Sequence, residues 1–169
     1  MTIHPKPIEG RAWRLGDNVD TGQLALAEYS AQGVAVYARH CLEHLRPEFA
    51  AEVRPGDLVV AGENFGSGSS RETAVLALKH LGVAAVVAAS FARLFFRNAI
   101  NLGLPVVECK EVARIADGDR VVVDPWRGQV DNLTRQESYP ASALPEHLRE
   151  LLEAGGLVPW LERRMRDSR

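Results

Sequence analysis

The sequence predicts an α/β fold, and three observations support this prediction. Short apolar runs rich in valine alternate with segments whose apolar residues recur at helical spacing. The length of 169 residues suits a single core. Hydrophobic residues make up 46% of the chain and charged residues 25%, which is typical of globular proteins and excludes disorder, a fibrous repeat and a coiled coil. We therefore expect residues 1–169 to form one domain of strands and helices.

The first third of the chain is expected to hold one strand and two short helices. Residues 1–10 are expected to be an N-terminal tail, and a short strand-like stretch follows from Arg11 before the turn residues of GDN and DTG. Apolar residues recur at mixed helical spacing over residues 31–52, where Pro47 interrupts the pattern. This segment therefore predicts a pair of short helices.

The middle of the chain predicts two strand–helix units. Residues 58–61 form a β-branched apolar run typical of a strand covered on both faces, and a glycine-rich loop over 62–68 follows. Residues 70–81 have one apolar helical face, with Gly82 placed as a C-cap. The run 83–89 predicts the next buried strand.

The rest of the chain predicts a helix, a strand, a hairpin and a C-terminal helix. We expect a helix over residues 91–102, stopped by Gly103, and a strand over 105–108. The final elements expected are strands at 119–124 and 130–134, joined as a hairpin by PWRG, a helix over 145–154, and a charged tail or helix over 157–169.

Charge, cysteine content and hydropathy limit the function classes. The formal net charge of −2 gives no general reason to expect a nucleic acid or an anionic membrane as partner. The start of the chain, MTIHPKPIEG, has no apolar region of a signal peptide, and no run approaches the roughly 18–20 apolar residues that span a bilayer. Cys41 and Cys109 are too few for a disulfide framework or an iron–sulfur cluster. We expect a cytoplasmic protein with reduced thiols and no metal of its own.

The segment GENFGSGSSRE, residues 62–72, carries the strongest chemical signal. A glycine loop that leads from a strand into a helix presents backbone N–H groups and the positive end of the helix dipole to an anion. Arg71 could hold a carboxylate or phosphate with two parallel hydrogen bonds. The structural alternative stays open, because Ser69 and Glu72 also have the spacing of a capping box.

Two nucleotide-binding motifs fit this loop poorly. A P-loop needs a lysine after its last glycine, and a dinucleotide fingerprint needs a third glycine in the first strand–helix unit; GSGSSR provides neither.

Other candidate residues are weaker. His40 and His44 have the spacing to meet on one helical face as metal ligands do, but with no third ligand a surface or interface role is favoured. Arg93 and Arg97 are also four residues apart, and we favour packing and ion pairing over contact with a substrate or another subunit. The aromatic residues of the C-terminal third, expected in core or interface, are Trp126, Tyr139 and Trp160.

Several separated motifs occur together in one order. GDNVDT and HLRPEFAAEVRPGD precede GENFGSGSSRE, and SFARLFFRNAINLGLPVVEC follows it. The stretch from Trp13 to Asp124 closely resembles the small subunit of 3-isopropylmalate dehydratase and homoaconitase, within the aconitase superfamily. The resemblance implies a swivelling β/β/α domain and a place in leucine biosynthesis. It also implies a separate large subunit that carries a 4Fe–4S cluster, with the active site between the two chains.

The resemblance also implies roles for the loop residues. Ser69 corresponds to the base that takes a proton from the carbon next to a carboxylate, and Ser70 and Arg71 correspond to substrate-binding residues. Because serine is a poor base at neutral pH, this role requires that the helix N-terminus and neighbouring donors stabilise the alkoxide. The cluster would act as a Lewis acid on the leaving hydroxyl. The remaining residues of the expected substrate site are Gly68, Asp20 and Thr21.

The sequence departs from the family pattern beside this site. Gly22 stands where the family has an active-site Asp, Leu26 stands where it has Pro, and Glu28 replaces a common Arg. The family's REHAP reads RETAV here, with Thr73 as the first difference. A lost carboxylate removes an acceptor and a charge, which changes the substrate that fits or the protonation of neighbouring groups.

We therefore expect the small subunit of a two-chain hydro-lyase that dehydrates or isomerises a small 2-hydroxy di- or tricarboxylic acid. The acids considered are 3-isopropylmalate-like, homoaconitate-like and citraconate- or dimethylmalate-like. The alternative is a non-catalytic partner subunit that keeps the fold and the assembly surface but has lost activity with the Asp at position 22.

Overall fold

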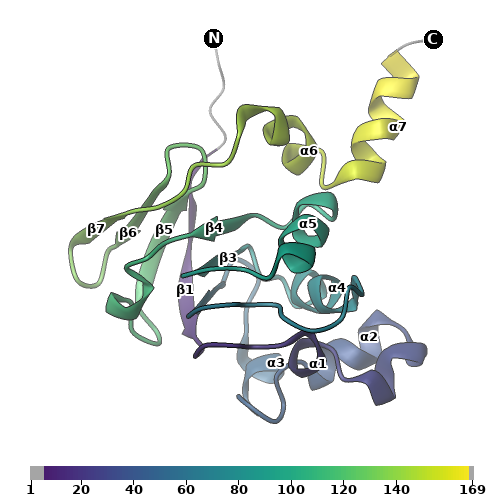
Figure 1. Cartoon of the computed structure of the whole chain (residues 1–169), viewed down its shortest axis with the longest axis horizontal. Coiled ribbons are helices and arrows are strands. Elements are labelled where there is room, and N and C mark those ends of the chain that lie inside the picture. Colours follow the sequence, from purple (N-terminus) through teal and green to yellow (C-terminus); the bar gives the residue numbers. More distant parts are fainter. Residues whose placement is uncertain (1–5, 168–169) are drawn as a thin grey trace.

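The computed structural model describes residues 6–167 and contains a seven-stranded sheet in the order β4-β3-β2-β1-β5-β6-β7 (Figure 1). The strands are β1 (Ile8–Arg14), β2 (Leu58–Ala61), β3 (Ala85–Ala88), β4 (Val106–Glu108), β5 (Arg120–Asp124), β6 (Gln129–Asn132) and β7 (Glu137–Pro140). The α-helices are α1 (Thr21–Leu24), α2 (Val34–Tyr37), α3 (Phe49–Glu52), α4 (Thr73–His80), α5 (Arg93–Asn101), α6 (Arg149–Glu153) and α7 (Leu157–Asp167). The 3₁₀ turns are η1 (Ala27–Gln32), η2 (Ala38–His40), η3 (Val112–Arg114) and η4 (Glu146–Leu148).

Strand β1 joins the two halves of the sheet by changing partners along its length. Its C-terminal part pairs in parallel with β2, with Ala12 opposite Leu58, and its N-terminal part pairs antiparallel with β5, with Ile8 opposite Val123. Gly10 allows this arrangement, because a Cβ there would lie 2.1 Å from the carbonyl oxygen of Gly56.

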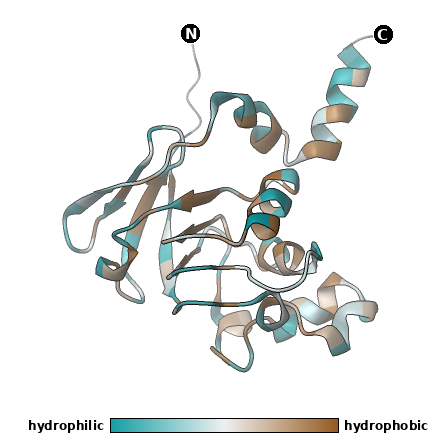
Figure 2. Cartoon of the chain, viewed as in Figure 1, coloured by the Kyte–Doolittle hydropathy of each residue, from teal (hydrophilic) through white to brown (hydrophobic). Residues whose placement is uncertain are grey.

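The two faces of the sheet bury two separate apolar clusters. Val59, Val86 and Val106 face α4 and α5 in the larger cluster. The alternate strand residues, such as Val60 and Val87, pack against β5, β6 and β7, which curl over this face. Figure 2 shows hydrophobic residues along the strands and on the helices beside them. The layers are therefore sheet, sheet and helix, as the β/β/α expectation requires.

The predicted elements are largely present, with shifted ends. The helix expected from residue 70 begins at Thr73, and the helix expected from residue 91 begins at Arg93. The strands expected at 83–89 and 105–108 are the shorter β3 and β4, and the hairpin is β5–β6. The sequence prediction missed β7, which pairs with β6 and has one buried side chain, that of Tyr139.

The two chain ends also differ from expectation. The expected N-terminal tail over residues 1–10 is wrong for residues 8–10, which belong to β1; residues 1–5 lie outside the described range. The segment 157–169, expected as tail or helix, forms α7 up to Asp167, and residues 168–169 again lie outside that range. Helix α7 extends away from the body of the molecule (Figure 1), and none of its side chains is buried. No helix between residues 6 and 167 is long and apolar enough to cross a membrane.

Candidate functional site

The candidate site lies at the carboxyl edge of the parallel strands. Because β1, β2, β3 and β4 run parallel, the segments that follow them all emerge at the same edge of the sheet. Residues 15–20 follow β1 and residues 62–72 follow β2. Parallel sheets bind ligands at this edge in many folds, since loops and helix N-termini converge there.

Two backbone contacts and one side-chain hydrogen bond bring Asp20 and Thr21 against the glycine loop. Asp20 and Ser67 form an isolated parallel bridge, and the Thr21 N–H donates to the Ser67 carbonyl at 2.8 Å. The Thr21 hydroxyl oxygen, in a buried side chain, accepts from the Ser69 N–H at 3.0 Å. Thr21 therefore positions the backbone of Ser69. The structure thus brings together residues that are 48 positions apart in the sequence.

A shallow pocket of about 250 Å³ opens between α1 and the loop. It contains five of the six residues predicted for the site, and Ser70 is absent from its wall. The lining residues are Asp20, Thr21, Gly22, Ala25, Ala27, Gly68, Ser69, Arg71 and Thr73.

The capping box predicted for Ser69 and Glu72 is wrong. Helix α4 begins only at Thr73, its N-cap residue Glu72 has helical backbone angles, and no side chain caps it. The Ser69 hydroxyl oxygen instead accepts from the Arg71 N–H at 3.3 Å. The alternative that explained these residues by helix capping alone is therefore wrong, and the ligand-binding interpretation stays a prediction.

The capping box of this site belongs to Asp20 and Gln23. The Gln23 N–H donates to Asp20 Oδ1 at 3.0 Å, and the Asp20 N–H donates to Gln23 Oε1 at 3.0 Å. One carboxylate oxygen of Asp20 is therefore occupied by α1. The sequence DTGQ carries the signal for this motif, which the prediction overlooked.

Asn98 is a second residue that sequence reasoning missed. Its side chain is buried within α5, and its amide Nδ2 donates to the Ser70 carbonyl at 2.8 Å. This bond ties the loop to α5 and orients the peptide between Ser70 and Arg71. No local signal in the sequence distinguishes this asparagine from a surface one, because its partner lies 28 residues away.

Aromatic packing fixes the first half of the glycine loop. The Phe65 ring packs edge-to-face on Phe95 of α5, with centroids 5.1 Å apart, and Phe65 also forms a bridge with Phe91. Gly66 has φ +81°, and a Cβ there would lie 2.2 Å from the Phe95 ring. The loop therefore needs glycine at this position both for its backbone angle and for space.

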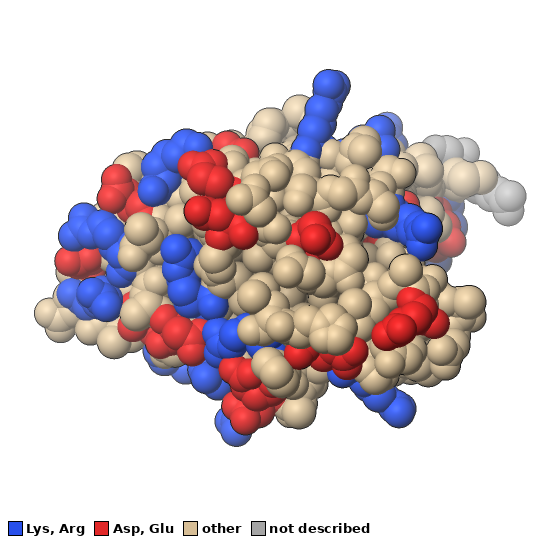
Figure 3. Space-filling view, turned by 60° about the horizontal axis from the view of Figure 1, so that its bottom comes forward, with Lys and Arg blue, Asp and Glu red and all other residues tan. Residues whose placement is uncertain are grey.

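Arg71 carries the positive charge of the pocket wall. Its side chain is exposed, and no hydrogen bond or ion pair joins its guanidinium to another residue of the described chain. A cation on the pocket wall with its five donors free is suited to bind a carboxylate. Figure 3 shows one face of the molecule, where basic and acidic side chains alternate around an area of other residues, so the net charge of −2 produces no single-sign surface there.

The two histidines do not share a helical face, which removes the metal-ligand alternative considered for them, and the exposure of His44 fits the favoured surface role. The 3₁₀ turn ends at His40, and residues 41–45 form turns. His40 stacks on Tyr29 at 3.7 Å between centroids and is 2.6 Å from a carboxylate oxygen of Glu43, whereas His44 is exposed. Over residues 6–167 no group of three His, Cys, Asp or Glu side chains is placed to hold a metal ion.

The cysteines do not fit an iron–sulfur cluster. Cys41 lies in the cluster on the helix side of the sheet and Cys109 in the cluster on the other side. Burial raises the pKa of both thiols, which keeps them protonated and unsuited to ligation.

The three other aromatic candidates have different surroundings. Tyr139 is buried in the cluster against β5 and β6. Trp126 is partly buried under the Arg149 guanidinium, 4.9 Å from its ring centroid, and Trp160 is partly buried on α7.

Comparison with known proteins agrees with this architecture. Residues 42–111 match the family model described as the aconitase C-terminal domain. The chain is 55% identical over 152 residues to a 3-isopropylmalate dehydratase small subunit from Archaeoglobus fulgidus, covering 89% of this chain and 94% of the relative. This chain belongs to the family of 3-isopropylmalate dehydratase small subunits.

A second relative and a solved structure extend the comparison. The isopropylmalate/citramalate isomerase small subunit of Methanocaldococcus jannaschii is 45% identical over 95% of this chain and 97% of its own length. The crystal structure of a 3-isopropylmalate dehydratase from the same organism superposes with a TM-score of 0.90 at 40% identity, over 96% of this chain and 98% of that one. As a dehydratase small subunit, the chain is part of a hydro-lyase that functions with a large subunit.

Proposed function

We propose that this small subunit, together with its large subunit, dehydrates and rehydrates a 2-hydroxy dicarboxylic acid of the 3-isopropylmalate or citramalate type in the cytoplasm. The observation that carries the proposal is the pocket at the carboxyl edge, where the Ser69 hydroxyl and the free Arg71 guanidinium share one wall. The relatives' names, which include 3-isopropylmalate dehydratase and isopropylmalate/citramalate isomerase, support this class of acid.

Arg71 and the loop backbone bind the substrate in this proposal. The guanidinium holds one substrate carboxylate through parallel hydrogen bonds. Gly68 has no side chain and lies beside Thr21, so a ligand can approach the loop backbone closely. Ser70 is exposed next to Arg71 but outside the pocket wall, and its hydroxyl contributes a further donor at the rim.

Ser69 acts as the base. In its alkoxide form, Ser69 Oγ takes the proton from the carbon next to the bound carboxylate and becomes a hydroxyl. The electron pair of that C–H bond forms the double bond, and the hydroxyl on the adjacent carbon leaves with its bonding pair as hydroxide, which the large subunit's cluster would stabilise as a Lewis acid. The backbone N–H of Arg71 already donates to Ser69 Oγ at 3.3 Å, and the N-terminus of α4 adds positive potential. Both stabilise the alkoxide form of Ser69. Thr21 holds the Ser69 backbone in place for this transfer.

Gly22 widens the pocket where the family pattern has Asp. In this pocket Asp20 is the one acidic residue of the wall, and a Cβ at position 22 would lie 3.0 Å from its Oδ1. The missing carboxylate leaves room and removes a negative charge beside the substrate. The space beside Gly22 therefore affects which substituent a substrate of this class can carry, and a panel of acids is needed to identify the acid that fits.

The 4Fe–4S cluster of the reaction belongs to the large subunit in this proposal. The two cysteines of this chain are buried on opposite faces of the sheet, and the described residues include no other thiol ligand. This chain contributes substrate binding and proton transfer.

Anaerobic turnover of the co-expressed two-chain complex tests the proposal. The panel comprises 3-isopropylmalate, citramalate, dimethylmalate and homocitrate, and the absorbance of the unsaturated product is followed. We expect turnover with at least one of the three dicarboxylic acids, a loss of about 10²–10⁴-fold in kcat for Ser69→Ala, and a raised KM for Arg71→Lys. A cluster-loaded complex that is silent on every acid would overturn the proposal in favour of a non-catalytic subunit.

A further inference from the structure

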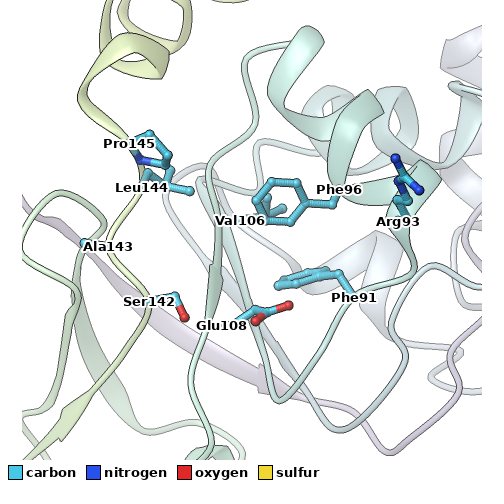
Figure 4. Close-up of a pocket in the computed structure, with 9 residues that line it drawn as sticks. All are labelled: Phe91, Arg93, Phe96, Val106, Glu108, Ser142, Ala143, Leu144 and Pro145. Atoms are coloured by element: carbon cyan, nitrogen blue, oxygen red, sulfur yellow. The ribbon is translucent and has the colours of Figure 1, made fainter.

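A second pocket lies on the same edge of the sheet as the candidate site. It has a volume of about 320 Å³ and is formed by β4, the start of α5 with Phe91 before it, and the segment before η4 (Figure 4). We call it the anchor pocket. Its lining residues are Phe91, Arg93, Phe96, Val106, Glu108, Ser142, Ala143, Leu144 and Pro145.

The anchor pocket has an apolar floor and a polar rim. In Figure 4 the rings of Phe91 and Phe96 face Leu144 across the space, and the side chains of Glu108 and Ser142 lie at its border. The Glu108 carboxylate and the Ser142 hydroxyl form no hydrogen bond or ion pair with other residues in the described range. An apolar hollow with free polar groups at its border has the anatomy of a protein–protein hot spot.

Helix α5 connects the anchor pocket to the candidate site. Phe96 lies on the pocket side of the helix, and Asn98 on the other side bonds the Ser70 carbonyl. Between them, Arg93, Leu94 and Arg97 face outward, and we call these three residues the α5 face. Its large apolar side chain, Leu94, is 39% exposed.

The α5 face carries charge that the fold does not use. We expected packing and ion pairing for Arg93 and Arg97, and the ion-pairing part is wrong, because neither guanidinium has a polar partner within residues 6–167. Arg46, Arg114 and Arg135, in contrast, each pair with a carboxylate. Free guanidinium groups beside an exposed leucine favour a partner with carboxylates at matching positions.

We infer that the large subunit docks on the α5 face, with an apolar side chain in the anchor pocket and carboxylates opposite Arg93 and Arg97. The inference rests on the proposed function, because a large subunit that completes the site must cover the Ser69 loop. The α5 face and the anchor pocket adjoin that loop on the same edge, so the interface continues across them. Leu94 lies in the middle of this surface, where apolar contact excludes water from the charged pairs.

Affinity between the two subunits tests the inference without relying on turnover. We would measure the dissociation constant for the purified large subunit by biolayer interferometry, at two salt concentrations under anaerobic conditions. Ser142→Trp fills the anchor pocket from its exposed rim, and Arg93→Glu with Arg97→Glu reverses the charge of the α5 face. We expect each variant to weaken binding at least tenfold, and we expect the charge reversal to weaken the salt dependence.

Matched controls lie at the opposite, amino edge of the sheet. Arg54→Glu and Ala51→Trp make the same kinds of change on exposed residues before β2, and we expect neither to alter affinity more than twofold. Circular dichroism and the unfolding midpoint of each isolated variant verify the fold. Affinity unchanged in both the Ser142→Trp and the charge-reversed chain would overturn the inference.

The inference and the proposed function fail in different ways. Ser69→Ala should bind the large subunit with unchanged affinity while losing turnover. If the α5-face variants keep full affinity but Ser69→Ala loses turnover, the docking surface is wrong and the proposed role of Ser69 stands. If those variants lose affinity but Ser69→Ala keeps turnover, the docking surface stands and the assignment of the base is wrong.

Discussion

At the residue scale, the candidate site depends on two small residues and one threonine. Gly66 lets the loop turn against the Phe95 ring, Gly68 leaves the loop open to a ligand, and Thr21 fixes the Ser69 backbone. The loop residues were predictable because strand, glycines and helix follow one another in sequence. Asn98 became visible only with the contacts in three dimensions, since its partner, the Ser70 carbonyl, lies 28 residues away, whereas the Asp20 capping box is encoded locally in DTGQ and was overlooked.

Replacing Gly66 with alanine should destabilise the protein through both steric overlap and backbone strain. The added Cβ would lie 2.2 Å from the Phe95 ring at a φ of +81°, so we expect a loss of at least about 2 kcal/mol in the free energy of unfolding. Urea denaturation provides the measurement. Gly118→Ala is the control, because Gly118 has a φ of +82° and no residue beyond its chain neighbours lies within 4 Å of the added Cβ. Backbone strain alone should therefore cost about 1–2 kcal/mol there. Equal losses in the two variants would show that the loop shifts away from Phe95 freely.

At the element scale, buried parallel strands and amphipathic helices were predictable, and edge elements were not. The valine-rich β2 and β3 are covered on both faces, so their sequences are apolar throughout. The edge strand β7 buries one side chain and ends at Pro140, so its sequence has no apolar alternation that would reveal it. The start of α4 was placed too early because Ser69 binds an N–H of its own loop rather than the helix.

The start of the β5–β6 hairpin should make stability depend on acid pH. Burial alone would raise the pKa of Asp119, but hydrogen bonds from Asn132, the Ala116 N–H and Arg135 outweigh it and hold that pKa below its usual value. A lowered folded pKa means that the carboxylate stabilises the protein above about pH 4 and loses this effect as the pH falls through the folded value.

Asp119→Asn should therefore cost about 1.5–3 kcal/mol at pH 7, because it removes hydrogen bonds to a charged acceptor. The difference from the wild type should stay constant between about pH 5 and 7 and shrink below about pH 4. Thermal and urea unfolding across this range provide the measurement. Glu153→Gln, on the exposed side of α6, reports the effect of net charge alone. If the difference in unfolding free energy between Asp119→Asn and the wild type does not change with pH, the ionised Asp119 carboxylate is not the origin of the stabilisation.

Helix α7 should be dispensable for the stability of the fold. None of its residues is buried, and Val158 and Met165 are 64% and 66% exposed. A chain that ends at Gly156 should keep its unfolding midpoint within about 4 °C, which for a domain of this size corresponds to roughly 1 kcal/mol. Leu152→Ala in the adjoining α6 should cost about 2 kcal/mol or more, since that side chain is buried. A larger loss on truncation than on Leu152→Ala would show that α7 supports the core.

At the scale of the whole molecule, β1 holds the two layers of strands together. Its Trp13 side chain is buried in the helix-side cluster and donates through Nε1 to Asp57 at 2.9 Å, while Ala12 faces the other cluster. The sequence predicted an α/β core and a hairpin separately. That one strand pairs with both could not be inferred, because no local pattern records a change of partner within a strand.

Gly10→Ala should weaken both halves of the sheet equally. The added Cβ would overlap the Gly56 carbonyl, and β1 would have to move away from the turn before β2. We expect amide protection in β3 and in β6 to fall by the same free energy, at least about 1 kcal/mol, in native-state hydrogen exchange. Loss of protection in β6 alone would mean that the two layers open independently.

The central position of β1 has a consequence for synthesis on the ribosome. Among the described strands β1 emerges first, and its parallel partners up to β4 are complete once residue 108 has left the exit tunnel. Its antiparallel edge over Ile8–Arg11 then stays unpaired until β5, at residues 120–124, has also left the exit tunnel. During this interval the nascent chain exposes a free strand edge of the kind that pairs with other chains. Chaperone demand in the cell should therefore peak between the appearance of β4 and that of β5.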